Sequence, residues 1–324
     1  MSLGGRILVS GASGFIGRAI TARLAAEGAE IVVALRRPQP VPGAASQVEA
    51  GDLAAPNPAL KLALRGCGAV VHAAGLAHRY QVSPQALHAT NVTAAARVAE
   101  AAAQARVPRL VLISSAAIHG KSRAGLVTEA SDPRPDDEYA ASKLAGEAAV
   151  RAALAGSATA LTIVRPCAVV GPGCSGNIPR LARLLARGLP LPFGAIRNAR
   201  SFIAVDDLAG LIAAILAAEA PPELVLAAHP APISTPGLIR ALARGLNRRA
   251  VLLPAPPFLL EAAAKAAGRG AQWQSFAGSF HADPSLARGR LGFVAPTGIE
   301  TALERTAASL RQSLRYHDTT SRSS

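Results

Sequence analysis

The chain has 324 residues, half of them apolar, and it carries a formal net charge of +14 at pH 7. Its length allows one large domain or two closely joined ones. The arginines are scattered and aromatic residues do not alternate with them, so the charge favours an anionic substrate and cofactor over nucleic acid.

Strand and helix patterns alternate through the first half of the chain. We expect strands at residues 7–10, 30–35, 47–50, 69–73, 109–114 and 159–165. We expect helices at residues 15–27, 59–65, 83–106 and 139–154. Apolar strands separated by helices indicate a parallel sheet covered on both faces. The pattern therefore predicts an α/β fold with a doubly wound parallel sheet of the Rossmann type.

The sequence pattern changes after Pro166, where proline and glycine become frequent and the expected helices and strands become shorter. We predict a dinucleotide-binding domain made of residues 1–165 and about 201–220. Residues 166–200 and 221–315 are predicted to form a smaller α/β substrate-binding domain. The terminal residues 316–324 are expected to be a flexible tail.

Neither a metal site nor a membrane span is expected. The three cysteines form no CxxC pair, and the seven histidines show no metal-ligand spacing. The longest apolar helical run, residues 208–218, is too short to cross a bilayer. The N-terminus shows none of the regions of a signal peptide, so we expect a cytoplasmic protein.

The first candidate site is the glycine-rich segment between the first strand and the first helix. Gly11 permits a tight turn, Gly14 lets the backbone approach a pyrophosphate, and Gly17 lets helix and strand pack closely. The helix N-terminus then faces the phosphate charge. The strand–loop–helix context strengthens a motif that is weak alone. The predicted cofactor contacts here are Gly11, Ser13, Gly14, Phe15, Ile16 and Gly17.

The second strand ends in Arg36 and Arg37, where enzymes that use NAD commonly carry an acid for the ribose 2′-hydroxyl. Two arginines favour a 2′-phosphate, so we predict NADP(H), with NAD(H) and a solvated arginine pair as the alternatives. Other strand ends offer weaker cofactor contacts, with Asp52 suited to the adenine amino group. These contacts are Asp52, Leu53, Ala73, Ala74 and Gly75.

Tyr139 and Lys143 open a predicted helix, and their spacing of four puts both side chains on one face. A phenol has a pKa of about 10, but a nearby ammonium and the nicotinamide ring favour the phenolate. Tyr139 is thus predicted to exchange a proton as hydride moves, while Lys143 binds the nicotinamide ribose. Ser114 and Ser115 either bind the substrate oxygen or only cap the fifth strand, and Ser114 is also a predicted cofactor contact. Asn91 is either a polar support of the cofactor site or an ordinary N-cap.

These segments together resemble the extended short-chain dehydrogenase/reductase family, in its nucleotide-sugar epimerase, dehydratase and reductase branch. The resemblance covers nearly the whole chain, in motifs that include GASGFIG, HAAG, SSAAIHG, YAASK, RPCAVVGPG and RSFIAVDDL. It implies Ser115 as the catalytic hydroxyl, Tyr139 as the acid/base and Lys143 as its partner. It also implies a homodimer, through a helix pair that includes the Tyr139 helix.

The resemblance further implies contacts with the nicotinamide and with a substrate diphosphate. Residues 165–171, with Pro166, resemble the stretch that contacts the nicotinamide carboxamide. Asn177 and Arg200 resemble diphosphate-binding residues, and a guanidinium suits that group chemically. The alternative for Arg200 is a surface arginine. The implied substrate is a nucleotide-sugar.

Departures from the family pattern narrow the reaction. Ala116 and Ala117 stand where sugar 4,6-dehydratases usually carry Asp-Glu, which argues against dehydration. Residues 191–198 look more like those of bacterial amino-sugar 4-ketoreductases. We therefore expect NADPH-dependent reduction of a nucleotide-linked 4-keto (amino)sugar, with an NAD-dependent nucleotide-sugar 4-epimerase as the alternative. A lipid-linked sugar, a steroid or a flavonoid as substrate, and a cofactor-sensing regulator without catalysis, are further alternatives.

Overall fold

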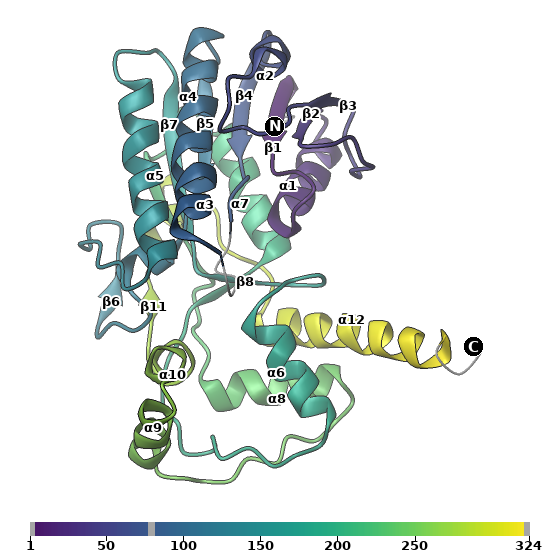
Figure 1. Cartoon of the computed structure of the whole chain (residues 1–324), viewed down its shortest axis with the longest axis vertical. Coiled ribbons are helices and arrows are strands. Elements are labelled where there is room, and N and C mark those ends of the chain that lie inside the picture. Colours follow the sequence, from purple (N-terminus) through teal and green to yellow (C-terminus); the bar gives the residue numbers. More distant parts are fainter. Residues whose placement is uncertain (1–3, 77–81, 321–324) are drawn as a thin grey trace.

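A parallel sheet forms the centre of the larger part of the molecule, in a computed structural model that describes residues 4–76 and 82–320 (Figure 1). Its strands are β1 (Arg6–Ser10), β2 (Glu30–Leu35), β3 (Ser46–Glu49), β4 (Cys67–His72), β5 (Arg109–Ile113), β7 (Ala160–Pro166) and β10 (Leu224–Ala227). They lie in the order β10-β7-β5-β4-β1-β2-β3. This order is doubly wound, because the chain extends the sheet in opposite directions from β1. The predicted Rossmann-type sheet is confirmed.

Helices cover both faces of this sheet. They are α1 (Phe15–Ala26), α2 (Pro58–Ala63), α4 (Ala94–Gln104), α5 (Glu138–Leu154), α7 (Val205–Ala217) and α11 (Ser285–Leu291). Successive side chains of a strand point to opposite faces. Accordingly, Ile7 and Val9 of β1 pack with α1, α7 and α11, whereas Leu8 packs with α2, α4 and α5. The hydrophobic core therefore has one layer on each side of the sheet.

The helix expected over residues 83–106 is divided in the structure. It consists of α3 (Pro84–His88), a π-helical turn (Ala89–Thr93) and α4. α3 begins after Ser83, whose side chain accepts a hydrogen bond from the backbone N–H of Ala86 at 3.2 Å. The π-helical turn packs closely on α5, where a Cβ at Gly146 would lie 2.2 Å from the Asn91 carbonyl oxygen.

A smaller part of the molecule lies beyond the carboxyl ends of the strands (Figure 1). Its helices are α6 (Asn177–Ala186), α8 (Thr235–Gly245), α9 (Pro257–Ala266), α10 (Gly270–Ala277) and α12 (Ile299–Thr320). Two-stranded pairs join it to the larger part: β6 (Leu126–Val127) with β11 (His281–Ala282), and β8 (Ala168–Val170) with β9 (Phe202–Ala204). α6, α8 and α12 share their own hydrophobic core.

Two expected boundaries differ from the structure. Residues 221–315 are predicted to belong to the substrate-binding domain, but β10 pairs in parallel with β7 of the main sheet, and its Val225 and Leu226 are fully buried. α12 continues to Thr320, across the start of the tail expected at 316–324, and its Leu303 and Ala307 pack in the core with α8. Residues 321–324 lie outside the described residues. Within the described ranges, every helix is too short or too polar to span a membrane.

Candidate active site

Two neighbouring cavities open at the carboxyl ends of the strands, on either side of the glycine loop. The first, of about 600 Å³, is bordered by the ends of β1 to β4, and the second, of about 420 Å³, by those of β5 and β7. The sheet order reverses between β1 and β4, and ligands of doubly wound folds bind at such a switch point. The two cavities are therefore the candidate active site.

Most residues predicted from the sequence line these cavities. The first cavity contains Gly11, Ser13, Gly14, Arg36, Arg37, Asp52, Leu53, Ala73, Ala74 and Gly75. The second contains Phe15, Ile16, Ser114, Ser115, Tyr139, Pro166, Asn177 and Arg200. Gly17, Asn91 and Lys143 line neither cavity and lie behind their walls.

The glycine loop is too tightly packed for side chains at two of its positions. Gly11 has a φ of +74°, and a Cβ there would lie 2.4 Å from the Ala74 nitrogen. A Cβ at Gly17 would lie 2.1 Å from the Gly11 carbonyl oxygen. Gly14 is the N-cap residue of α1, and no side chain of the described residues caps that end of the helix. Its first-turn N–H groups are thus available to a phosphate, so the loop fits a dinucleotide diphosphate.

Arg36 and Arg37 are exposed at the wall of the first cavity, directly after β2. Neither forms an ion pair within the described part of the chain. Asp52, on the same wall, accepts a hydrogen bond from the Ala54 backbone N–H at 3.0 Å, which orders the turn after β3. This part of the first cavity therefore presents two guanidinium groups that form no ion pair with the described residues.

Asn91 connects the loop after β4 to α5. Its side-chain oxygen accepts from the Leu76 backbone N–H at 2.9 Å, and its nitrogen donates to the Leu76 carbonyl at 3.2 Å and to the Ser142 hydroxyl at 2.9 Å. The N-cap expectation is wrong, since Asn91 lies inside the π-helical turn and Ser83 caps the helix. Asn91 is the polar support of the cavity wall.

Tyr139 and Lys143 lie on one face of α5, beside the two serines that follow β5. Tyr139 is hydrogen-bonded with Ser115 at the wall of the second cavity. Burial raises the pKa of the Tyr139 phenol, and this hydrogen bond opposes the rise. The Lys143 ammonium donates to the Ile113 carbonyl at 2.7 Å. Its burial lowers the pKa of Lys143 to about 8, against the opposing charge of Glu147.

A buried ionic network that the sequence reasoning missed lies behind this pair. Glu147 accepts from the Ser114 hydroxyl and from two nitrogens of Arg165, at 3.0 and 2.7 Å. Arg165 also contacts His119 Nε2 at 3.0 Å. A guanidinium can only donate, so His119 Nε2 accepts and the ring is neutral. Burial and then Arg165 lower the pKa of His119, in agreement.

One signal for this network was present in the sequence. Glu147 follows Lys143 by four residues, which repeats the spacing from Tyr139 to Lys143. That spacing places all three side chains along one face of α5.

Basic groups line the opposite wall of the second cavity. The Arg200 guanidinium donates to the carbonyls of Lys121 and Gly278, at 3.1 and 2.7 Å, and burial lowers its pKa. Lys121, which no motif had indicated, lines the same cavity and pairs with Asp137 at 2.9 Å. Asn177 is exposed at the start of α6. Arg200 is thus held in the wall and is not a loose surface arginine.

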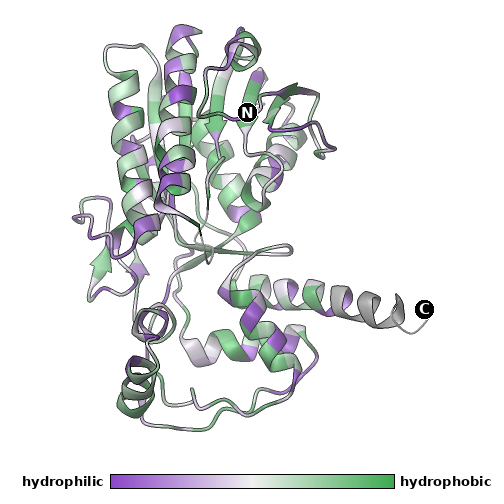
Figure 2. Cartoon of the chain, in the orientation of Figure 1, coloured by the Kyte–Doolittle hydropathy of each residue, from purple (hydrophilic) through white to green (hydrophobic). Residues whose placement is uncertain are grey.

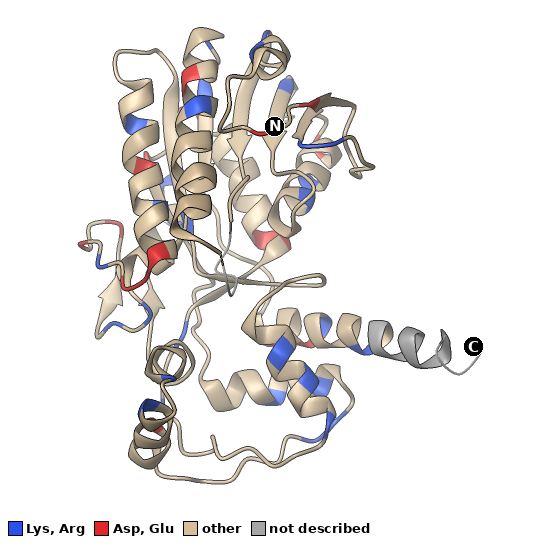
Figure 3. Cartoon of the chain, viewed as in Figure 1, with Lys and Arg blue, Asp and Glu red and all other residues tan. Residues whose placement is uncertain are grey.

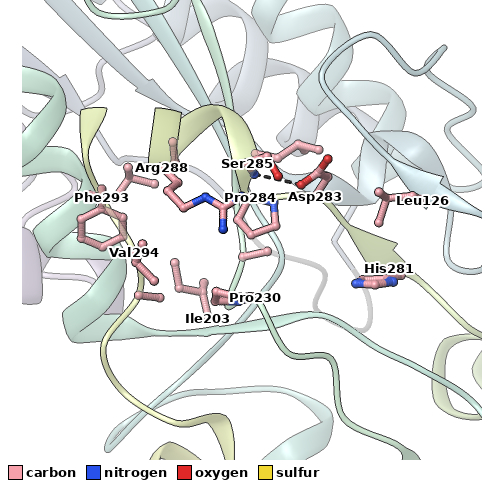
Figure 4. A pocket seen from close by; sticks show the side chains of 15 residues that line it. Leu126, Ile203, Pro230, His281, Asp283, Pro284, Ser285, Arg288, Phe293 and Val294 are labelled. Atoms are coloured by element: carbon pink, nitrogen blue, oxygen red, sulfur yellow. Dashed lines mark hydrogen bonds between the residues drawn. The ribbon is translucent and has the colours of Figure 1, made fainter. Parts of the chain in front are cut away.

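A third cavity, of about 270 Å³, lies between β9, β10 and α11 and shares no residue with the other two (Figure 4). Figure 4 shows its Asp283 bound to the Ser285 backbone N–H, at 2.9 Å. Its remaining walls are mainly apolar. Among the described residues, no group of three possible ligands is placed to hold a metal ion.

Comparison with known proteins agrees with this geometry. The model of the NAD dependent epimerase/dehydratase family matches residues 7–227. UDP-glucose 4-epimerase of Vibrio cholerae is 28% identical over 314 residues, 94% of this chain and 95% of the relative. The dTDP-6-deoxy-L-talose 4-dehydrogenase (NAD(P)(+)) of Kitasatospora kifunensis is 38% identical over 178 residues, 53% of this chain and 55% of the relative. The structure of MoeE5 in complex with UDP-glucuronic acid and NAD superposes with a TM-score of 0.78 at 28% identity, covering 95% of this chain and 100% of MoeE5.

Proposed function

Because the chain belongs to the NAD dependent epimerase/dehydratase family, we propose that it transfers hydride at carbon 4 of a nucleotide-linked hexose. The chain is an NAD(P)-dependent enzyme of the extended short-chain dehydrogenase/reductase type. The proposal rests on one observation above the others. The hydrogen-bonded hydroxyls of Ser115 and Tyr139 face the second cavity, with the Lys143 ammonium one helical turn behind.

The glycine loop and the wall of the first cavity fit the cofactor. The loop has the close packing and the uncapped helix end that a diphosphate needs, and Arg36 and Arg37 border the adenosine end. A bound nicotinamide dinucleotide supplies the hydride acceptor and donor. Asn91, Gly75 and Lys143 hold the wall behind it, since a Cβ at Gly75 would lie 3.1 Å from Asn91 Oδ1 and 3.6 Å from Lys143 Nζ.

Tyr139 moves the proton at the substrate oxygen. In the reductive direction its phenol donates a proton to the carbonyl oxygen, and in the oxidative direction the phenolate removes one from the hydroxyl. The Ser115 hydroxyl orients that oxygen. The Lys143 ammonium stabilises the phenolate electrostatically. The Ile113 carbonyl and the Glu147 carboxylate keep Lys143 in place and favour its charged form.

The opposite wall suits a nucleoside diphosphate. Arg200 brings a positive charge to the second cavity, beside Lys121, which is paired with Asp137. Asn177 adds an amide at the start of α6. A planar guanidinium matches the oxygens of a diphosphate. Ala116 and Ala117 offer no acid or base beside Ser115, which supports chemistry confined to the hydroxyl or keto carbon.

Net reduction by NADPH is the first form of this reaction that we propose. Its support is the pair Arg36 and Arg37 at the first cavity, which suits the 2′-phosphate of NADP. Epimerisation with retained NAD is the second candidate. Its support is the similarity to UDP-glucose 4-epimerase of Vibrio cholerae over nearly the whole chain.

The two forms differ in whether the cofactor turns over. With NADPH and a UDP-4-keto-6-deoxy amino sugar, a reductase consumes the nicotinamide absorbance in proportion to the sugar. An epimerase instead interconverts UDP-hexoses with bound NAD and no net change in absorbance. Absence of both reactions across UDP- and dTDP-linked hexoses and their 4-keto forms would overturn the proposal.

A further inference from the structure

Exposed apolar side chains gather at the end of the molecule that is farthest from the main sheet. Five large apolar residues there are at least half exposed: Leu189, Val251, Leu253, Phe258 and Leu259. The segments that carry them are adjacent, because the Leu191 backbone N–H donates to the Val251 carbonyl and that of Leu253 to the Leu191 carbonyl, both at 2.9 Å. Figure 2 shows the hydrophobic colouring of α9, which follows these segments.

α9 lies outside the core, whereas its neighbour α10 is anchored to it. None of the residues of α9 is buried. On α10, the Phe276 ring packs edge-on against Phe193 with centroids 4.8 Å apart, and the Phe276 carbonyl accepts from the Thr235 hydroxyl at 2.7 Å. The Phe258 side chain, on the first turn of α9, is 69% exposed. α9 thus presents exposed apolar side chains, Phe258 and Leu259 among them, to solvent.

Exposed arginines stand close along the chain to two of these apolar residues, Leu189 and Val251. Four arginines of this region are exposed: Arg183 on α6, Arg187 directly after α6, and Arg248 and Arg249 after α8. None of them forms an ion pair within the described part of the chain. Residues 172–205 and 224–260 contain no aspartate or glutamate. Figure 3 shows the basic residues on α6 and on the loops beside it, with few acidic ones nearby. We call these four arginines and the five apolar residues the basic–apolar surface.

We propose that the basic–apolar surface docks the enzyme on a membrane that contains anionic lipids. Exposed apolar patches of this kind mark interaction sites. Apolar side chains that enter the headgroup boundary, with arginines beside them, bind anionic bilayers through both apolar burial and charge. A second copy of the chain is disfavoured, because a two-fold contact would bring the two sets of arginines together. The four arginines favour an anionic partner, and Phe258 and Leu259 favour a partner with an apolar interior.

Docking would place the second cavity close to the bilayer. α10 packs on α9, and its Ser275 lines that cavity together with Phe280, which follows α10. The docking residues themselves do not line the cavity. Binding to a membrane and turnover of a soluble nucleotide-sugar are therefore separable properties, and the first does not depend on the function proposed above.

Cosedimentation of the full chain with vesicles tests the proposal. We expect binding to vesicles of phosphatidylcholine and phosphatidylglycerol in equal parts, weak binding to phosphatidylcholine alone, and release by salt. Phe258→Ser should weaken the binding by about tenfold, because one aromatic side chain no longer enters the bilayer. Its matched control is Leu62→Ser on α2, an apolar side chain 64% exposed on the sheet domain, which should bind as the unaltered chain does.

Reversal of the arginine charges provides a second test of the proposal. Arg248→Glu with Arg249→Glu should weaken binding by about tenfold or more, whereas Lys61→Glu with Arg65→Glu, exposed residues near α2, should not. The proposal is overturned if the chain does not bind anionic vesicles or if both control variants lose binding equally. It is also overturned if Phe258→Ser changes only the oligomeric state in sedimentation velocity, or if nucleic acid removes the chain from the vesicles at equal charge.

Discussion

Arg165 and Glu147 form a two-pronged ion pair inside the wall of the second cavity. Arg165 Nε lies 3.0 Å from Glu147 Oε1, and a terminal nitrogen lies 2.7 Å from Oε2. The two side chains are only 6% and 4% exposed. The pair joins β7 to α5 one turn beyond Lys143, so it fixes the helix that carries Tyr139.

Glu147→Gln should lower the free energy of unfolding by about 3–5 kcal/mol, because it leaves the Arg165 charge buried without a counter-charge. Urea denaturation measures the change. Glu223→Gln removes the exposed partner of Arg151 and should cost less than about 1 kcal/mol. Equal effects of the two substitutions would contradict the role given to the buried pair.

Tyr139→Phe should reduce kcat by about 100- to 10,000-fold, because no other group on the wall replaces the phenol in proton transfer. Its free energy of unfolding should change by less than about 1 kcal/mol. Ser275→Ala is the matched control, because its hydroxyl donates to the Ala271 carbonyl at 3.0 Å on the same cavity wall. A Tyr139→Phe enzyme that keeps most of its kcat would remove Tyr139 from the mechanism.

The rate should fall as pH rises above about 8, because the pKa of Lys143 is lowered to about 8 and the ammonium is the form that stabilises the phenolate. Burial disfavours the charged form of Lys143, so this lysine lowers the stability of the fold below pH 8. That loss of stability disappears as the pH rises from about 8 to the ordinary pKa of a lysine. The pH profile of kcat/KM measures the effect on rate. Lys143→Arg keeps its positive charge at alkaline pH, so its kcat/KM should fall only at a higher pH than that of the unaltered chain. If an active Lys143→Arg enzyme loses its kcat/KM at the same pH as the unaltered chain, Lys143 is excluded as the titrating group.

Stability should decrease on acidification below pH 6.5 partly through His72. Burial lowers the pKa of His72 to about 3, so between these pH values the unfolded chain binds a proton that the folded chain does not. His72→Asn, which can retain a hydrogen bond to the Ser10 hydroxyl, should reduce the slope of stability against pH by about 1.4 kcal/mol per unit. His88→Asn on the exposed surface is the control. Equal slopes for the two variants would contradict this role of His72.

Arg36→Ser should weaken NADPH binding by about 10- to 100-fold and leave NADH binding nearly unchanged, because only NADPH carries a 2′-phosphate. Titration of the cofactor fluorescence gives both dissociation constants. Arg97→Ser, away from both cavities, is the control. An equal loss for both cofactors, or tighter binding of NADH by the unaltered chain, would favour NAD and thereby epimerisation.

The sheet could be read from the sequence because each buried strand is a continuous apolar run. The ends of β2 and the residues of the glycine loop agree with those expected. β10 was missed although Leu224–Ala227 is an apolar run, because it has only four residues and lies between proline-rich segments; its place in the sheet comes from its pairing with β7. Local pattern does not report such tertiary pairing.

The site was predictable where a motif fixes a residue at a strand or helix end, as for Gly11 and Tyr139. Lys121 and His119 were not predictable, because they belong to the irregular segment after β5, which the rest of the fold positions. Arg165 belongs to the segment predicted to contact the nicotinamide, but its guanidinium donates to Glu147 inside the protein. Burial of a charge is a property of packing, which the sequence does not display.

Transfer of deuterium from carbon 4 of the sugar tests the proposed reaction. The purified chain is incubated with its cofactor and UDP- or dTDP-linked hexoses deuterated at carbon 4, and NMR follows the label. We predict that deuterium leaves carbon 4 and is recovered either on the nicotinamide or on the opposite face of the same carbon, and that Tyr139→Phe suppresses the transfer. Label that remains in place with every hexose, or that exchanges with solvent instead, would contradict hydride transfer at carbon 4.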